Sequence, residues 1–166
     1  SPYSIMKYDE LQFIFAEAGK IGAIPGGDLA AQDYYIEGIT SSVKYWIGVD
    51  PKKSGITDET INNFISNYAP YDGTLENILN QKYIAMFWVS YEAWHDYRRT
   101  GYPKLNVGMG TFNNHVLPTR FEYPVNTAST NPTEYQKAVS RMKADYGGAD
   151  NMRTPIWWSK QAATIK

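Results

Sequence analysis

Apolar side chains recur every third or fourth residue in three stretches of the first half of the chain, which is the spacing of an amphipathic helix. The first stretch covers residues 7–20. The second follows a Gly/Pro turn at residues 25–27, with Asp28 as its expected N-cap, and continues to about Trp46. The third runs from Thr57, a capping residue, to about Tyr68.

The longest apolar pattern lies between Thr74 and Pro103, and we expect it to form one long helix. Thr74 is a good N-cap, Gly101 allows a helix to end, and Pro103 prevents it from restarting. Residues 83–89 are apolar on every side of this helix, a pattern typical of a helix surrounded by other elements. We therefore expect it to be buried and to form the core.

Helices in succession predict an all-α fold in which two helix pairs pack around this long helix. The arrangement is similar to a tetratricopeptide stack, although the pairs start about fifty residues apart and that repeat has a period of about thirty-four. One function that this pattern favours is a helical-repeat scaffold without sugar binding, whose concave face binds a protein or peptide.

The helical rhythm stops after Pro103. Residues 104–117 have the glycines and asparagines of a surface loop, residues 121–123 resemble a short strand, and Asn131-Pro132 predicts a further helix start. We expect residues 1–166 to form a single domain, with helix pairs in 1–103 and a loop-rich segment with one helix in 104–166.

Composition narrows the function classes. Apolar residues make up 43% and aromatic residues 15%, which suggests an aromatic-rich core or surfaces that stack on flat ligands. A net charge of -1 makes nucleic acid an unfavourable partner, because phosphate-backbone binders carry a basic surplus. The chain has no cysteine, which excludes disulfides, thiolate catalysis and cysteine-ligated zinc within these residues. No apolar run is as long as a membrane span.

Three separate segments carry a family resemblance. They are QKYIAMF with EAWHDYRRTGYP (residues 81–87 and 92–103), LPTRFEYP (117–124), and GGAD followed by two tryptophans (147–150 and 157–158). In order and spacing they resemble the signature of the SusD/RagB family. The helix at residues 7–20 also resembles the corresponding helix of that family.

The resemblance implies both an architecture and a function. SusD-like proteins are helical lipoproteins at the outer-membrane surface of glycan-using Gram-negative bacteria. They bind oligosaccharides without cleaving them and partner a SusC-like TonB-dependent transporter. Members are about three times this length and are anchored through an upstream acylated cysteine. The resemblance thus implies that these residues are the C-terminal part of such a protein. Part of the packing surface would then belong to the remaining N-terminal part, so we expect an exposed apolar patch.

The predicted loop carries the first candidate ligand site. Phe112, Asn113, Asn114 and His115 lie in it, and Tyr71 lies in the turn before the long helix. An aromatic ring stacks on a sugar face, and planar amides pair with vicinal hydroxyls, so these residues suit oligosaccharide recognition. The alternative is that asparagines occupy turns for backbone reasons.

Trp157 and Trp158 form a second candidate for sugar stacking. Adjacent side chains of an extended chain point to opposite sides, so at most one of them faces a ligand. We include Trp158 among the candidate ligand-binding residues, while a structural role for the pair is favoured.

Two further patterns suggest chemistry that we do not expect. Glu92 and His95 have a spacing used by metal-binding helices, but the chain has no second copy of that motif. Glu92 and Asp96 lie on one helical turn, whereas glycosidase carboxylates approach a sugar from opposite sides. We expect them to pair with Arg98 and Arg99. We therefore predict no metal site, no cofactor and no catalytic residues.

Overall fold

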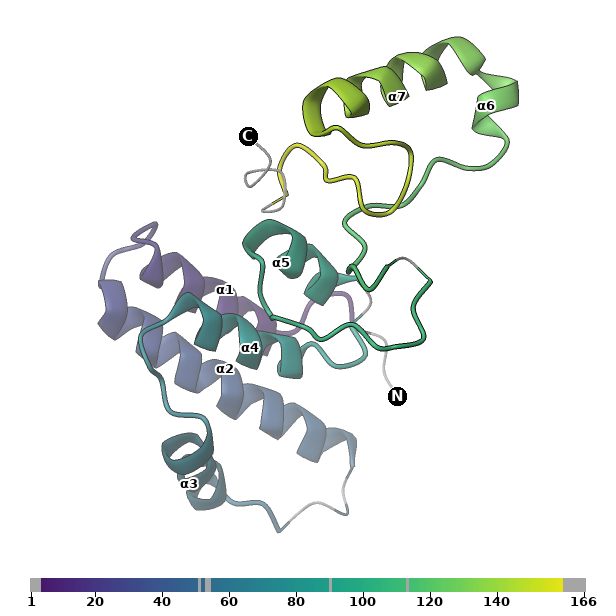
Figure 1. Ribbon diagram of the computed structural model, residues 1–166. Coiled ribbons are helices and arrows are strands. Elements are labelled where there is room, and N and C mark those ends of the chain that lie inside the picture. The colour runs from purple at the N-terminus through teal and green to yellow at the C-terminus, as the bar shows by residue number, and fades with distance from the viewer. Residues whose placement is uncertain (1–3, 51, 53–54, 90, 113, 160–166) are drawn as a thin grey trace. The chain divides into compact units, whose positions relative to one another are not determined.

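The computed structural model describes residues 4–50, 52, 55–89, 91–112 and 114–159. Within these ranges it contains helices and no strand, which confirms the predicted all-α class. None of the described helices is long and apolar enough to cross a membrane. The helices are α1 (Tyr8–Lys20), α2 (Gly27–Val49), α3 (Asp58–Tyr68), α4 (Leu75–Ala85), α5 (Glu92–Thr100), α6 (Thr127–Thr130) and α7 (Pro132–Tyr146) (Figure 1).

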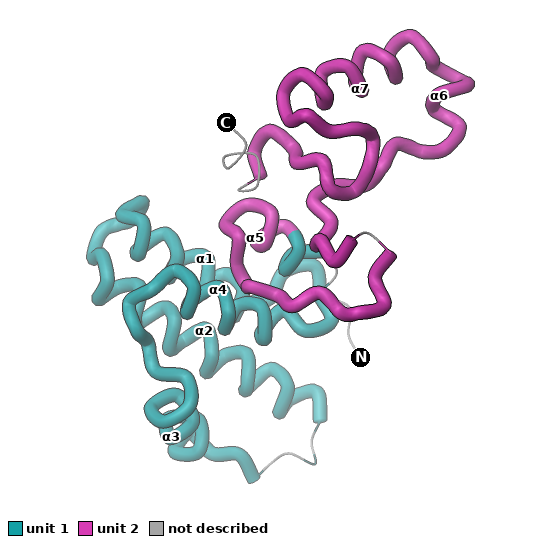
Figure 2. Tube along the Cα trace, viewed as in Figure 1, with its two compact units in different colours: residues 1–94 teal, residues 95–166 magenta. Residues whose placement is uncertain are grey.

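The chain divides into two compact units, residues 1–94 and residues 95–166 (Figure 2). The first unit contains α1 to α4 and the start of α5, and the second contains the rest of α5, α6 and α7. The expectation of a single domain stays a prediction.

In the first unit, α1 and α2 form an antiparallel hairpin. Ser4, just before α1, has its Oγ 3.1 Å from the hydroxyl of Tyr45 near the end of α2, and Lys20 at the end of α1 pairs with Asp28 at the start of α2 at 2.8 Å. α4 packs against both helices, and α3 packs against α2 (Figure 1).

These four helices share one core. Phe13 of α1 meets Tyr35 of α2 edge to face, with ring centroids 6.2 Å apart. The Tyr35 hydroxyl donates to the carbonyl of Ala69 at 3.0 Å, so its buried polar atom is paired. Burial raises the pKa of Tyr35 to about 12. Ile61 and Ile65 of α3 and Ile78 and Ala85 of α4 complete the core.

The caps predicted at Thr57 and Thr74 are confirmed. The amide of Thr60 donates to Thr57 Oγ1 at 3.2 Å, and the amide of Asn77 donates to Thr74 Oγ1 at 3.0 Å. The prediction that Asp28 caps α2 is wrong. The helix begins two residues earlier than predicted because Gly26 takes the N-cap position with a left-handed φ of 103°, which places Asp28 in the first turn.

The prediction of one long helix from Thr74 to Gly101 is also wrong, because α4 ends at Ala85 and α5 begins at Glu92. A continuing helix would bond the carbonyl of Ala85 to the amide of Val89. Instead Lys7 Nζ donates to that carbonyl at 2.7 Å, and the Val89 amide turns to the carbonyl of Met86 at 2.9 Å. Trp88 has a left-handed φ of 67°, which is incompatible with a helix.

Residues 83–89 are consequently only half buried. Ala85, Met86 and Val89 face the core, whereas Ile84 and Phe87 are exposed to 63% and 62% of their surface. The expectation that this segment is enclosed on every side is wrong for the first unit. The expected exposed apolar patch is present.

In the second unit, α7 begins at Pro132 as predicted, although Asn131 makes no side-chain capping bond. The helix ends at Gly147, which has a φ of 65°. The short helix α6 was not predicted. The strand expected at residues 121–123 does not form, because the Tyr123 amide donates to the carboxylate of Asp150 at 3.1 Å rather than to another strand.

Candidate functional site

The predicted sugar-binding loop presents its aromatic residue to solvent. Phe112 is fully exposed, and Asn114 and His115 adopt left-handed backbones with φ of 59° and 57°. Asparagine and histidine are both enriched among the few non-glycine residues that adopt this conformation. Asn113 lies outside the described residues.

Local hydrogen bonds hold this loop in its shape. Thr111 Oγ1 donates to the carbonyl of Gly108 at 3.1 Å, and His115 Nδ1 lies 3.2 Å from Thr111 Oγ1 and 3.3 Å from the same carbonyl. His115 therefore closes the loop from within.

Beneath the loop lies a pocket of about 240 Å³. Its described lining comes from three parts of the second unit: Phe112, Asn114, Glu122, Asn151, Met152 and Arg153. It combines an aromatic ring, two amides, a carboxylate and a guanidinium, so it offers donors and acceptors around one apolar face. We call it the polar pocket.

Thr119 joins two of the segments that line the polar pocket. Its amide donates to the carbonyl of Met152 at 2.8 Å, and its hydroxyl lies 3.1 Å from that carbonyl and 3.0 Å from the carbonyl of Thr154. Thr119 is buried. The segment around residue 120 and the tail around residue 152 are therefore fixed to each other.

A buried ion pair reinforces this junction. Arg120 Nη1 lies 2.7 Å from Asp150 Oδ1, and both side chains are about nine-tenths buried. Burial alone would raise the pKa of Asp150, but the hydrogen bonds from Arg120 and from the Tyr123 amide outweigh it and hold the pKa below its usual value. The Arg120 guanidinium also lies over the ring of Tyr123, 5.1 Å from its centroid.

The two tryptophans of the tail differ in their surroundings. Trp157 is exposed to 81% of its surface, whereas Trp158 is half-buried with the Arg98 guanidinium 4.7 Å from its ring centroid. A cation over the ring gives Trp158 a structural contact. Its ligand-binding role stays a prediction.

Tyr71 belongs to the first unit. Its ring packs against the core residue Tyr35 with centroids 5.3 Å apart, and its hydroxyl donates to Asp28 at 3.4 Å. Burial raises the pKa of Tyr71. These contacts tie the turn before α4 to the start of α2, and a ligand contact by Tyr71 stays a prediction.

Part of the expected ion pairing in α5 is present. Asp96 pairs with Arg99 at 2.8 Å. Arg98 is buried and donates to the carbonyl of Thr119 at 3.4 Å. These contacts attach α5 to the segment that carries the polar pocket.

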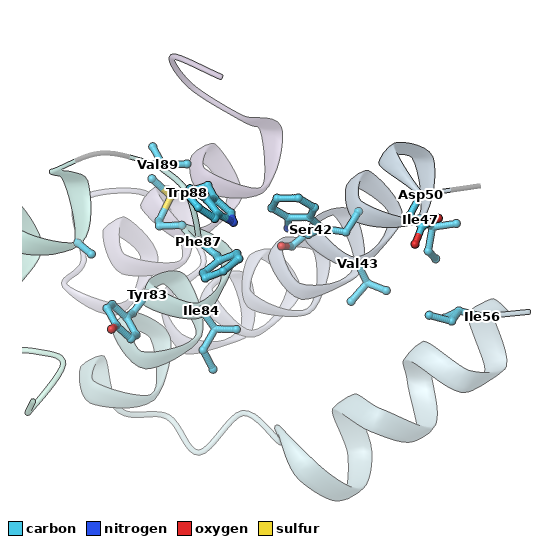
Figure 3. Close-up of a pocket in the computed structure, with 13 residues that line it drawn as sticks. Ser42, Val43, Ile47, Asp50, Ile56, Tyr83, Ile84, Phe87, Trp88 and Val89 are labelled. Atoms are coloured by element: carbon cyan, nitrogen blue, oxygen red, sulfur yellow. The ribbon is translucent and has the colours of Figure 1, made fainter. Parts of the chain in front are cut away.

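The first unit contains a cavity of about 1110 Å³, which is larger and far less polar than the polar pocket of the second unit. We call it the apolar groove. One side is α2 and the other is the end of α4 with the turn that follows it (Figure 3). Its main lining residues are Val43, Trp46, Ile47, Ile84, Phe87 and Trp88.

The comparison with family models decides the family. The model named SusD-like, described as starch-binding and associating with the outer membrane, matches residues 1–124, about three-quarters of the chain. The chain belongs to the SusD-like family. The resemblance drawn from the three sequence segments is confirmed.

A solved structure also resembles this SusD-like chain. The crystal structure of a SusD homolog from Parabacteroides distasonis is similar with a TM-score of 0.72 and 28% identity. The match covers 96% of this chain but 34% of that one, so the chain spans about a third of its solved relative. No curated protein matches the chain.

The structure shows how two of the SusD-like segments meet. Arg120 of the LPTRFEYP segment pairs with Asp150 of the GGAD segment. Both segments are recognisable in the sequence, but the pairing between them is not. The signal available in the sequence was one charged residue of opposite sign in each segment, Arg120 in the first and Asp150 in the second.

Of the predicted ligand residues, the structure brings Phe112 and Asn114 to one pocket. Glu122, Asn151, Met152 and Arg153 complete its lining and were not predicted. Glu122 carried a weak signal, because it is the polar residue between Phe121 and Tyr123 in the LPTRFEYP segment. The other three depend on the fold of the tail, which has no periodic pattern.

Proposed function

We propose that the protein containing these residues captures oligosaccharides at the outer membrane as a non-catalytic subunit of a nutrient-uptake system. Membership of a family described as starch-binding and associating with the outer membrane supports this proposal. The observation that carries it for this chain is the polar pocket with a fully exposed aromatic ring at its rim.

The chemistry of the polar pocket suits a sugar ring. The Phe112 face provides an apolar surface for the C–H groups of a pyranose. The Asn114 and Asn151 amides supply both donors and acceptors, and Glu122 and Arg153 supply an acceptor pair and a donor fork for vicinal hydroxyls. Its volume is below the roughly 300–1,000 Å³ of drug-sized sites, so it would hold one sugar unit of a longer chain.

The same pocket favours binding over cleavage. Glycoside hydrolysis usually requires two carboxyl groups on either side of the scissile bond. Glu122 is the single carboxylate among the described residues that line this pocket. A bound oligosaccharide would therefore be released intact.

In this proposal the protein passes its ligand to a SusC-like TonB-dependent transporter. It is held at the cell surface by a lipid on a cysteine outside these residues. Both features follow from the family resemblance.

A scaffold that binds a protein or peptide is the second candidate function. The apolar groove favours it, because its lining is mainly aromatic and aliphatic and offers few partners for hydroxyl groups. Affinity for soluble oligosaccharides distinguishes the two functions.

Isothermal titration calorimetry of the full-length protein against a panel of plant and host oligosaccharides tests the proposal. We expect saturable binding that Phe112→Ala weakens about ten-fold, or about 1.4 kcal/mol. Phe64→Ala is the matched control, because Phe64 is a partly exposed phenylalanine on α3 and not part of the polar pocket. Unchanged affinity in Phe112→Ala would mean that the oligosaccharide binds outside the polar pocket. Absence of binding to every oligosaccharide would contradict the proposed function.

A further inference from the structure

The polar pocket holds two charged side chains of opposite sign that are free to meet a ligand. Glu122 and Arg153 both line it and both are exposed. Within the described part of the chain, neither side chain forms an ion pair or a hydrogen bond. Their charges sum to zero, so the pocket as a whole favours a ligand that is polar but neutral.

The side-chain amide of Asn151 is held so that it offers donors to a ligand. Its Oδ1 accepts from the backbone amide of Arg153 at 2.9 Å and from that of Thr154 at 3.1 Å. Its Nδ2 makes no hydrogen bond among the described residues, which leaves two N–H bonds for a ligand. The tail therefore supplies donors from both Asn151 and Arg153 to the polar pocket.

Two neighbouring donors favour a ligand atom that only accepts hydrogen bonds. A sugar hydroxyl both donates and accepts, whereas a carbonyl or carboxylate oxygen only accepts and has two lone pairs. A carboxylate would share a pocket of about 240 Å³ with the negative charge of Glu122, and like charges at that range repel. A neutral carbonyl group is the better match.

The other two contacts indicate what is attached to that carbonyl. An ionised carboxylate only accepts hydrogen bonds, so Glu122 favours a donor such as an N–H group. Met152 lends the pocket a flexible apolar side chain that suits a methyl group. The sugar substituent that combines a carbonyl, an N–H and a methyl group is the acetamido group.

We propose that the polar pocket selects a sugar unit that carries an N-acetyl group. Arg153 and Asn151 donate to the acetamide carbonyl. Glu122 accepts from the acetamide N–H, and Met152 contacts the methyl group, while the sugar ring lies on the face of Phe112. This inference rests on the proposed function, because it names the class of oligosaccharide that the pocket recognises.

Calorimetry of the full-length protein with chitotetraose and with cellotetraose tests this inference. The two oligosaccharides have the same ring and the same linkage, and they differ at C2, where the first has an acetamido group and the second a hydroxyl. We expect chitotetraose to bind about ten-fold more tightly, because a hydroxyl leaves polar groups of the pocket without partners.

Substitution of Glu122 shows whether the polar pocket is the source of this preference. Glu122→Leu removes the acceptor for the acetamide N–H and should bring the two affinities within about two-fold of each other. Glu122→Gln keeps an oxygen that accepts and should recover part of the preference. Glu59→Leu, at an exposed position of α3, is the control and should keep all of it.

Several results would overturn the inference. Equal affinities for the two oligosaccharides, or a preference unchanged in Glu122→Leu, would do so. Tighter binding of deacetylated chitotetraose would mean that Glu122 binds an ammonium group, and tighter binding of an oligogalacturonide would mean that Arg153 binds a carboxylate. Both results contradict an acetamide site.

These failures are distinguishable from failure of the proposed function. In each of them the protein still binds an oligosaccharide, so capture of oligosaccharides stands and the selectivity alone is wrong. Binding of other oligosaccharides without binding of chitotetraose belongs to the same class. Absence of binding to every oligosaccharide contradicts the proposed function and this inference together.

Discussion

Gly148 must be a glycine because the side chain of Thr154 lies too close to leave room for a Cβ. A Cβ at this position would overlap Thr154 Oγ1 and Cγ2. The Thr154 hydroxyl donates to the carbonyl of Ala149 at 2.6 Å, so displacing it breaks a bond that folds the tail. We expect Gly148→Ala to lower the free energy of unfolding by about 1–3 kcal/mol. Urea denaturation measures this, with Gly110→Ala, which has open space, as the control.

Glu10 is a buried carboxyl group that is poorly compensated. Its Oε2 atom has no hydrogen-bond partner among the described residues, and burial raises its pKa, with Lys82 opposing and Glu92 adding to the rise. A raised folded pKa means that the folded state holds its proton longer than the unfolded state. Stability is therefore lost as pH rises from about 4.5, the unfolded value, through the folded pKa.

Glu10→Gln should consequently raise the melting temperature at pH 7 and have a smaller effect at pH 4. Thermal unfolding followed by circular dichroism at the two pH values measures this. Glu59→Gln, on an exposed position of α3, is the control and should show no such difference. A lower melting temperature for Glu10→Gln at pH 7 would mean that the charge is stabilised by its surroundings.

At the scale of elements, the contact between α1 and α2 depends on Gly38. A Cβ there would lie 2.9 Å from Cε2 and Cζ of Phe13, a ring that is fully buried. We expect Gly38→Ala to destabilise the first unit by about 1–3 kcal/mol, because the ring has no free space to move into. Gly48→Ala in the same helix meets nothing within 4 Å and should be neutral or stabilising. Denaturant midpoints of the two variants give the comparison.

The elements that local signals define were predictable. Periodicity located α1, α2 and α3, and side-chain caps located the starts of α3 and α4. The interruption after Ala85 was not predictable, because it depends on Lys7, which lies 78 residues away in the sequence. A continuous apolar run predicts a buried helix from the sequence, whether or not other elements cover the outer face of that segment in the structure.

At the scale of the whole molecule, the candidate site depends on tertiary contacts more than the helices do. Phe112 and Asn114 were predicted from residue type, but Arg153 and Asn151 join them only because Thr119 and Arg120 hold the tail. Such long-range pairing leaves no periodic signal in an irregular segment. Family resemblance located the segments, and the structure supplied their partners.

Asp150→Asn tests this dependence. The pKa of Asp150 is lower in the folded protein than in the unfolded chain. The stabilisation by its ionised carboxylate is therefore present above about pH 3.8, the unfolded value, and is lost as pH falls through the folded pKa. Leaving the buried Arg120 without its charge partner should cost about 3–5 kcal/mol at pH 7 and less near pH 3. Hydrogen exchange should rise at residues 119–123 and 150–154. Unchanged exchange there would mean that the Thr119 contacts suffice; Asp145→Asn, exposed at the end of α7, is the control.

Residues 121–149 form a long excursion of the chain whose two ends are held together. Thr119 bonds to Met152, and Arg120 pairs with Asp150. Val125 in this loop is completely exposed and precedes α6, so it is accessible to proteases. A cut there would separate the covalent chain while the base contacts keep both pieces together. Limited proteolysis should therefore yield two fragments on a denaturing gel that elute as one species from a sizing column.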